Sequence, residues 1–201
     1  MKPDDSVAET KKLELALAGR KIPGFFPTPA PVIDRMLAAT GLLNGHGEKL
    51  RILEPQAGKG DIADTLKERL PGSAIVTCEM QSQLAEILKA KKHQVHHADF
   101  FTLSPEELGY FDRVVMNPPF EKGADMEHVR HAFNFLKDDG VLVSVMSAGV
   151  FFREDNKTRQ FREWYADLDH EVIDLPDRSF EEVGLIRKTG VSTKLLVIHK
   201  S

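Results

Sequence analysis

From residue 49 onward, short apolar runs alternate with segments of helical periodicity, and this alternation restricts the possible folds more than any other feature. The apolar runs lie at 50–53, 74–78, 95–97, 113–116 and 141–146, with helical patterns between them at 61–70, 81–91 and 125–137. Parallel strands need long crossover connections, which helices supply. We therefore expect an α/β fold, with a mostly parallel sheet and helices on both faces.

The two ends of the chain add to this pattern. A helix at 158–168 and strands at 171–175 and 191–199 follow the last apolar run. The connection between these strands shows no helical pattern, so we expect an antiparallel hairpin at the sheet edge. Upstream, we predict helices over 6–19, with Ser6 and Glu9 as a capping box, and over 32–41. We thus expect an N-terminal helical segment, 1–48, before a sheet domain, 49–201.

Composition limits the class of protein. The 201 residues include 27 Lys or Arg and 31 Asp or Glu, a net charge of −4, which is not the profile of a protein that coats nucleic acid nonspecifically. A local basic surface would still allow an enzyme to contact nucleic acid. The single cysteine, Cys78, excludes an intrachain disulfide and a zinc site built from cysteines. With no apolar run near the ~20 residues of a membrane span and no apolar signal segment, we expect a cytoplasmic protein.

A glycine-rich turn, Glu54-Pro-Gln-Ala-Gly-Lys-Gly60, follows the first apolar run and precedes a helix. Glycines allow the backbone to approach a ligand closely, and a helix N-terminus favours negative charge. Gly58, Gly60 and Ala63 also fit the loose dinucleotide fingerprint, so a nicotinamide-dependent oxidoreductase remains open. The alternative is a tight turn without a ligand.

Acidic residues follow the second and third apolar runs. Glu79 lies 19 residues beyond Gly60, the spacing of an acid that accepts from ribose hydroxyls, and Met80 beside it can pack on an adenine face. Asp99 can accept from an adenine amino group, and Phe100 can cover the ring. Because ligands of open α/β sheets bind at the carboxyl ends of strands, we predict a nucleoside site here. The alternative is a set of solvated acids at strand ends.

The tetrapeptide Asn117-Pro118-Pro119-Phe120, which ends the fourth apolar run, is the strongest signal. Prolines fix φ and cannot extend the ladder, so the carbonyls before them point outward. The Asn117 side-chain oxygen and a fixed carbonyl offer two acceptors to one exocyclic amino group. Phe120 offers a stacking surface for a flat base. The alternative is a proline turn that ends a strand.

The segment 148–164 interleaves aromatic and basic residues after the fifth apolar run. We take Phe152 and Arg153, with Lys194 at the start of the last strand, as tentative substrate contacts. The alternative for the helical part is an amphipathic helix with a buried aromatic face. We expect no metal site, because His96 and His97, neighbours on a predicted strand, would face opposite sides.

Together, these segments resemble class I S-adenosylmethionine-dependent methyltransferases of the amino-methylating branch, most closely small stand-alone DNA adenine-N6 methyltransferases of phage or mobile-element type. The resemblance covers about residues 22–199, and Phe26-Pro-Thr-Pro29 is similar to the family's N-terminal cofactor motif. It implies S-adenosyl-L-methionine as cofactor and a Rossmann-like seven-stranded sheet of order 3-2-1-4-5-7-6 with an antiparallel edge hairpin. The implied cofactor contacts are Phe26, Thr28, Pro29, Glu54, Pro55, Ala57, Gly58, Gly60, Glu79, Met80, Asp99, Phe100 and Asn117.

The resemblance also implies a reaction, with Asn117-Pro-Pro-Phe120 as its catalytic tetrapeptide. Asn117 and the Pro118 carbonyl would accept from an exocyclic amine of a nucleobase flipped from its stack, and Phe120 would stack on that base. Adenine N6 in DNA is the favoured target. RNA adenine N6 or guanine N2 and, more remotely, a protein glutamine amide are alternatives, as is a binding-only module.

Two features depart from the family pattern. Gln56 stands where small or acidic residues are more common. Only about 50 residues follow the fifth strand, too few for a full target-recognition domain. We therefore expect a nucleic-acid substrate, with DNA favoured over RNA, and leave open a partner subunit that supplies specificity.

Overall fold

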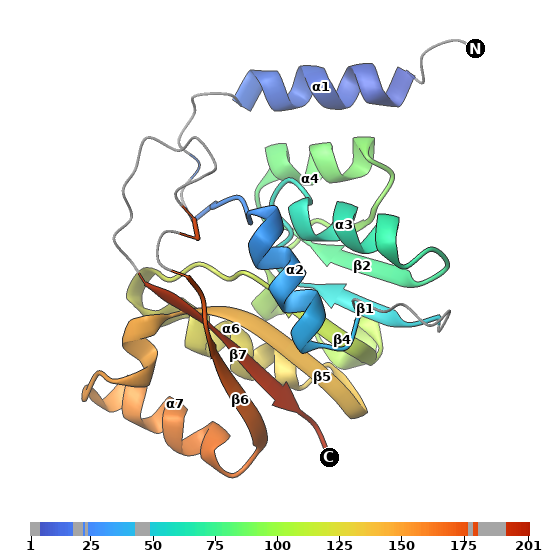
Figure 1. Ribbon diagram of the computed structural model, residues 1–201. Coiled ribbons are helices and arrows are strands. Elements are labelled where there is room, and N and C mark those ends of the chain that lie inside the picture. The colour runs from blue at the N-terminus through green and yellow to red at the C-terminus, as the bar shows by residue number, and fades with distance from the viewer. Residues whose placement is uncertain (1–4, 18–21, 23, 43–48, 177–178, 181–191) are drawn as a thin grey trace.

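The computed structural model describes residues 5–17, 22, 24–42, 49–176, 179–180 and 192–201 (Figure 1). The helices are α1 (Asp5–Leu17), α2 (Ala30–Ala39), α3 (Asp61–Arg69), α4 (Ser82–Ala90), α5 (Pro105–Leu108), α6 (Ala124–Phe133) and α7 (Asn156–Ala166), with short 3-10 turns η1 (Phe100–Thr102), η2 (Glu121–Gly123) and η3 (Ala148–Phe151). The strands are β1 (Arg51–Glu54), β2 (Ala74–Cys78), β3 (Gln94–His96), β4 (Phe111–Met116), β5 (Leu136–Ser147), β6 (Asp169–Asp174) and β7 (Thr193–His199).

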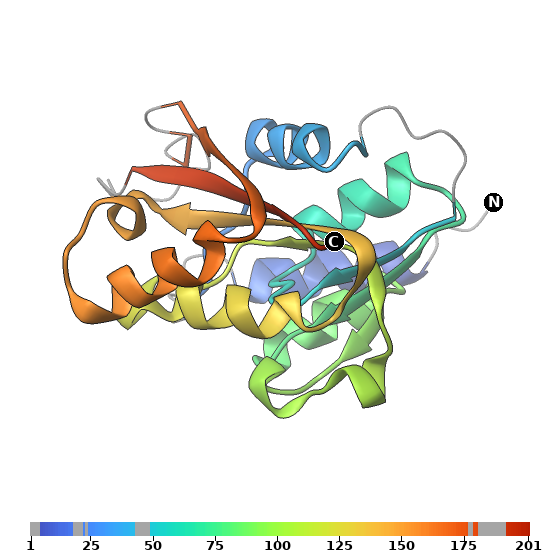
Figure 2. The same ribbon diagram turned by 90° about the horizontal axis from the view of Figure 1, so that it is seen from below.

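Within the described residues, the strands form one seven-stranded sheet of order β3-β2-β1-β4-β5-β7-β6, which confirms the expected Rossmann-like topology. Strands β1 to β5 pair in parallel, and β1 lies between β2 and β4. Strand β7 is antiparallel to both β5 and β6, so the predicted edge hairpin is present. Figure 2 shows α2 on one side of the sheet and α6 and α7 on the other.

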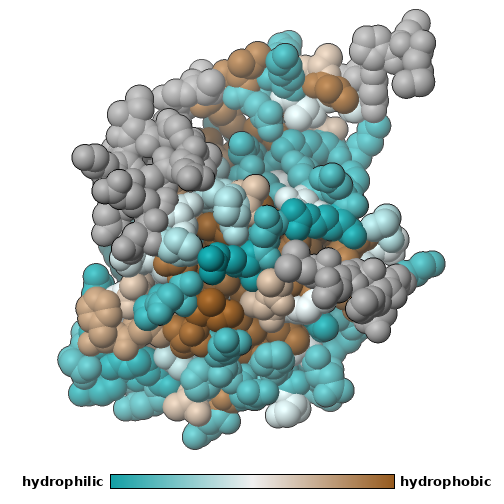
Figure 3. Space-filling model, viewed as in Figure 1, coloured by the Kyte–Doolittle hydropathy of each residue, from teal (hydrophilic) through white to brown (hydrophobic). Residues whose placement is uncertain are grey.

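Apolar side chains fill both spaces between the sheet and its helices. Phe111 and Phe161 belong to the cluster under α6 and α7, whereas Met36 and Leu37 of α2 belong to the cluster on the opposite face. Helix α2, predicted as part of the N-terminal segment, therefore shares the core of the sheet. On the side drawn in Figure 3, hydrophilic side chains cover most of the surface and apolar ones gather near its centre.

Several boundaries differ from the sequence-based expectation. The helix predicted to reach residue 137 ends at Phe133, and β5 starts at Leu136 instead of 141. Polar residues obscured this start, but Leu136 pairs with Phe111 of β4, and Asp139 donates its N–H to the Lys200 carbonyl. Ladder bonds to neighbouring strands therefore overrode the local pattern.

Further differences concern short or terminal elements. Helix α1 begins at Asp5, so Ser6 lies in its first turn rather than before it, and the predicted stop at Gly19 lies outside the described residues. Most of the 176–190 connection also lies outside them. Helix α5 was not predicted, although Ser104 and Glu107 form a capping box at its start. No described helix combines the length and apolarity that crossing a membrane requires.

The sheet brings the predicted functional residues to one edge. Glu54 is the last residue of β1, Glu79 follows β2, and Asn117 follows β4. Because these strands are parallel neighbours, all three residues lie at the same carboxyl edge.

The packing of α2 predicts a stability difference between two leucines. Leu37 is fully buried, whereas Leu15 of α1 is 65% exposed. We expect Leu37→Ala to lower the free energy of unfolding by about 2–5 kcal/mol, because it leaves a cavity against the sheet. Leu15→Ala, the matched control, should change it by less than about 0.5 kcal/mol. Urea denaturation measures both, and similar values for the two variants would contradict the packing of α2.

Candidate active site

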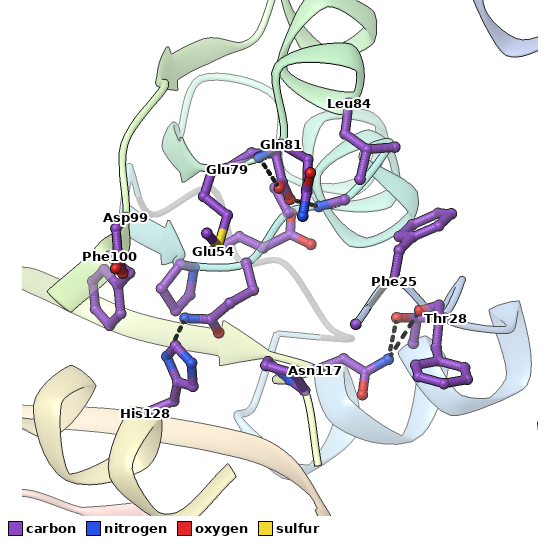
Figure 4. A pocket seen from close by; sticks show the side chains of 18 of the residues that line it. Phe25, Thr28, Glu54, Glu79, Gln81, Leu84, Asp99, Phe100, Asn117 and His128 are labelled. Carbon is purple, nitrogen blue, oxygen red and sulfur yellow. Dashed lines mark hydrogen bonds between the residues drawn. The ribbon is translucent and has the colours of Figure 1, made fainter. Parts of the chain in front are cut away.

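A pocket opens at the carboxyl edge of the sheet (Figure 4). Its empty space, including the open mouth, is about 750 Å³. The walls come from the loop before α2, the turn after β1, the β2–α4 connection and the start of η1, together with Asn117, Pro119 and His128. The pocket is thus assembled from segments far apart in the sequence.

Most of the predicted cofactor contacts line this pocket. Those that do are Phe26, Thr28, Glu54, Pro55, Ala57, Gly58, Glu79, Met80, Asp99, Phe100 and Asn117. Pro29 and Gly60 are outside its lining: Pro29 precedes α2 as its N-cap, and Gly60 precedes α3 with a left-handed φ of 97°. These two residues have a clear structural role at the starts of helices.

The glycine turn is held against the end of β2 and against the loop before α2. The Gly58 N–H donates to Glu79 Oε2 at 2.8 Å. A Cβ at Gly58 would lie 2.6 Å from the Phe25 ring, and the residue has a φ of 57°, so a larger side chain does not fit. Phe25 lines the pocket and was missed from the sequence, although its neighbour Phe26 was identified.

The loop before α2 also fixes the side chain of Asn117. Its Nδ2 donates to Thr28 Oγ1 at 3.0 Å and to the Phe26 carbonyl at 3.4 Å. The Thr28 N–H in turn donates to Asp61 Oδ2 at 3.2 Å. Both contacts of the Asn117 amide use its nitrogen, and no described residue donates to its Oδ1. That oxygen remains an oriented acceptor at the pocket.

Three buried or half-buried carboxyls make the pocket acidic. Burial raises the pKa of Glu54 well above its usual range, and the nearby charge of Asp61 adds to this effect. Burial also raises the pKa of Glu79, although N–H groups of Gln81 and Gly58 oppose the shift. Burial raises the pKa of Asp61 too, against the attraction of Lys59. Glu54 Oε2 is buried and lacks a hydrogen-bond partner among the described residues.

The region around η1 forms another side of the pocket. Asp99 is exposed, and its Oδ1 accepts from the Phe101 N–H at 3.0 Å, which caps η1. Phe100 is only 3% exposed and packs edge-on against His131, so it is mainly a core residue that borders the pocket. Met80, in contrast, is 60% exposed at the pocket.

The tetrapeptide is split between the pocket and the core. Asn117 and Pro119 line the pocket, whereas Pro118 is buried outside the lining. Phe120 is half-buried and packs against the apolar cluster on the α2 side of the sheet. Part of its ring remains accessible, so stacking of Phe120 on a base stays a prediction. The exposed aromatic beside Asn117 is Phe26, at 37%.

The tentative substrate residues are outside the pocket lining. Phe152 and Arg153 are exposed after η3, and Phe152 has 67% of its surface accessible. Lys194 forms an ion pair with Asp174 at 2.8 Å and lies 5.7 Å from the centre of the Phe151 ring. Its charge is therefore already paired with a carboxylate of the same hairpin.

The histidines on the β3 side have separate partners. His93 Nε2 lies 2.6 Å from Asp64 Oδ1, and His97 Nε2 lies 3.3 Å from Ser82 Oγ. Across the described part of the chain, no three His, Cys, Asp or Glu side chains gather as a metal site.

Comparisons with known proteins agree with this architecture. A family model described as "Methyltransferase small domain" matches residues 36–160, and no curated protein sequence matches. The solved structures that resemble the chain include a candidate class I S-adenosylmethionine-dependent methyltransferase from Listeria monocytogenes, with a TM-score of 0.70, 14% identity, and 98% of this chain matched to 68% of that one.

Two further structures are similar. The type IIG restriction endonuclease BpuSI matches with a TM-score of 0.72 and 16% identity, over 97% of this chain but only 28% of its own length. A candidate RNA methyltransferase from Pyrococcus horikoshii matches with a TM-score of 0.62 and 20% identity, over 96% of this chain and 98% of its own. At these identities the similarity concerns the fold.

The buried carboxyl of Glu54 predicts a pH-dependent stability difference. When the pKa of a carboxyl group is higher in the folded protein than in the unfolded chain, the folded protein becomes less stable as pH rises through this interval. The reason is that the unfolded chain ionises more readily than the buried group. We expect Glu54→Gln to stabilise the free protein at neutral pH by roughly 1–3 kcal/mol, because burial of this carboxyl costs free energy whether it stays charged or takes up a proton. The gain should shrink toward about pH 4, near the ordinary glutamate pKa.

Thermal and urea unfolding at a series of pH values test this expectation. Glu68→Gln, on the exposed face of α3, is the matched control and should show little change at any pH. A Glu54→Gln variant that is less stable than the parent at neutral pH would contradict the assigned burial cost.

Proposed function

The chain belongs to the methyltransferase small domain family, and we propose that it transfers the methyl group of S-adenosyl-L-methionine to an exocyclic amine of a nucleobase, with adenine N6 in DNA as the favoured target. One observation carries this proposal. The loop before α2 holds the Asn117 amide by its nitrogen and leaves Oδ1 as an acceptor beside an acidic pocket.

The pocket fits S-adenosyl-L-methionine by charge. At neutral pH this cofactor carries a sulfonium, an ammonium and one carboxylate, so it is a net cation. Four carboxyl residues line the pocket: Glu54, Asp61, Glu79 and Asp99. The unpaired Oε2 of Glu54 suits an N–H donor such as the ammonium. Glu79 retains lone pairs for ribose hydroxyls, and Asp99 retains them for the adenine amino group.

The same charges argue against the nicotinamide-dependent alternative. A dinucleotide carries an anionic pyrophosphate that ordinarily binds at the helix N-terminus after the glycine turn. Here the first turn of α3 contains Asp61 and Asp64, and Asp61 faces the pocket. These carboxylates oppose the positive end of the helix dipole, so the site favours a cation over a pyrophosphate.

The chain's own residues would align the reacting amine. When bound, S-adenosyl-L-methionine supplies a methyl group already activated by its sulfonium. Asn117 Oδ1 accepts one N–H of the target amine, and the Pro118 carbonyl is the expected second acceptor. Both contacts use the hydrogens of the amine, so its lone pair stays free and directed toward the methyl group. Alignment in a dry pocket accounts for much of the rate enhancement in such a reaction.

A flat base needs an apolar surface beside Asn117. Phe26 is the better candidate, because it is partly exposed, lines the pocket and accepts from Asn117 Nδ2 through its own carbonyl. Phe120, expected from the sequence to stack on the base, is half-buried and packs partly against the core. We therefore assign base stacking first to Phe26, and stacking by Phe120 stays a prediction.

The choice of polymer rests on the family resemblance of the motifs. BpuSI, which shares this fold, is a DNA restriction endonuclease, and the similar protein from Pyrococcus horikoshii is a candidate RNA methyltransferase. RNA is therefore the second candidate substrate. The net charge of −4 favours recognition through a local surface or a partner subunit over general attraction to nucleic acid.

A substrate assay tests the activity. The protein is incubated with methyl-labelled S-adenosyl-L-methionine and unmethylated duplex DNA, single-stranded DNA or total RNA, and the nucleosides are identified by mass spectrometry. N6-methyldeoxyadenosine is the expected product. A higher yield from single strands would indicate that base flipping limits the rate. Label in RNA alone would move the protein to the second candidate, and label in no polymer would contradict the proposal.

Substitution of Asn117 tests the mechanism. We expect Asn117→Ala to reduce methyl transfer by about 100-fold or more, because the oriented acceptor is lost in the transition state. Affinity for S-adenosyl-L-homocysteine, measured by calorimetry, should change only a few-fold, since the acidic residues remain. Asn134→Ala, an exposed substitution after α6, is the matched control. An Asn117→Ala variant with near-normal turnover would exclude the assigned role.

The Thr28→Val variant tests whether the orientation of the Asn117 amide matters for methyl transfer. This variant keeps Asn117 Oδ1 but removes the hydroxyl that accepts from Nδ2 at 3.0 Å. We expect an intermediate loss of turnover, roughly tenfold, because a misaligned acceptor still functions in part. A loss as large as that of Asn117→Ala would instead assign Thr28 a direct part in the reaction.

A further inference from the structure

Gln56 has an unexplained polar atom in the wall of the pocket. Its Nε2 lies 2.9 Å from His128 Nδ1, and its Oε1 is buried with no hydrogen-bond partner among the described residues. Both Gln56 and His128 line the pocket. A buried amide oxygen without a partner is costly, so its presence points to a donor that arrives with a ligand.

His128 orients the amide of Gln56. Burial lowers the pKa of His128 to about 4, so the ring is neutral at physiological pH. A neutral imidazole can accept a hydrogen bond at Nδ1, which an imidazolium cannot. In this structure the Gln56 amide directs its nitrogen, not its oxygen, to the His128 ring.

The position of His128 locates the Gln56 side chain within the pocket. The His128 ring stacks on Phe101 of η1, with 4.3 Å between ring centres. Asp99 caps the same turn and lines the same side of the pocket. The Gln56 side chain, bonded to His128, thus lies beside the part of the pocket where our proposed function puts the adenine of the cofactor.

We propose that Gln56 determines the specificity of the pocket for an adenine nucleoside, by accepting one N–H of its 6-amino group at Oε1. This inference rests on the proposed function, because it requires the cofactor to bind in this pocket. Asp99 accepts the other N–H of the same amino group, so the amine meets two acceptors. His128 is a positioning residue that holds the Gln56 amide and does not contact the cofactor.

The test compares two ligands that differ only in this amino group. S-Adenosyl-L-homocysteine and its purine analogue, which has hydrogen in place of the 6-amino group, are titrated calorimetrically into the full chain. The parent protein should prefer the amino ligand. Gln56→Met should reduce that preference by roughly tenfold, because one of its two hydrogen bonds is lost. Its affinity for the purine analogue should stay within a few-fold of the parent value.

Further variants distinguish loss of the Gln56 hydrogen bond from a change in the shape of the pocket. Gln56→Glu keeps an oxygen acceptor and should retain the preference for the amino ligand. His128→Phe keeps an aromatic ring against Phe101 but removes the hydrogen bond that orients the Gln56 amide. It should therefore lower the preference for the amino ligand in part. Gln83→Met, on the exposed surface of α4, is the matched control and should match the parent. Circular dichroism confirms that each variant is folded.

The outcomes distinguish this inference from the proposed function. If Gln56→Met lowers the affinity for both ligands equally, or for neither, Gln56 does not bind the 6-amino group and the inference is wrong. Loss of the preference in Gln56→Glu would also overturn it, which keeps the test decisive if Gln56→Met does not fold. If the parent protein binds neither ligand, the proposed function itself fails.

Discussion

The parallel pairing of β1 with β2 on one side and β4 on the other sets the positions of Glu54, Glu79 and Asn117 in the pocket. Leu53 is in register with both Val76 and Val114, so the three strands end together. Glu54, Glu79 and Asn117 follow these residues directly or closely, and the sheet leaves them no other edge to occupy. The helices on both faces then seal the sides of this edge and expose only its end.

The pocket combines groups that the folded chain satisfies with groups that it leaves unsatisfied. Glu79 accepts from two backbone N–H groups, and the Asn117 nitrogen has two acceptors, so both side chains are rigid before any ligand arrives. Glu54 Oε2 and Gln56 Oε1 are buried and have no hydrogen-bond partner in the part of the chain that the structure describes. Such atoms lower the stability of the free protein, and the free energy is recovered when a ligand supplies donors. The arrangement is typical of a preorganised site.

Short-range patterns in the sequence predicted the strands and the edge hairpin, whereas the sheet order and most of the pocket residues were implied by the family resemblance. Alternating apolar runs determine the strands, and the glycine turn and tetrapeptide directly follow them. The roles of single aromatic residues were less predictable, because they depend on long-range packing. Phe120 packs partly against the core, which the sequence did not indicate, and Phe25 lies against Gly58, more than 30 residues away in the chain. The contacts of Gln56 with His128 and of Lys194 with Asp174 likewise join residues far apart in the sequence, so local patterns do not indicate them.

The loop before α2 links the acidic part of the pocket to Asn117. Thr28 donates through its backbone to Asp61, which lines the acidic part of the pocket, and accepts through its hydroxyl from Asn117. A ligand that shifts this loop therefore changes the acidic part and the Asn117 amide together. If the proposed reaction is correct, a cofactor whose binding stabilises this loop favours substrate binding at Asn117, and by thermodynamic reciprocity the bound substrate strengthens cofactor binding by the same factor. Cooperative binding of the two ligands would then arise from one threonine, without any movement of the sheet.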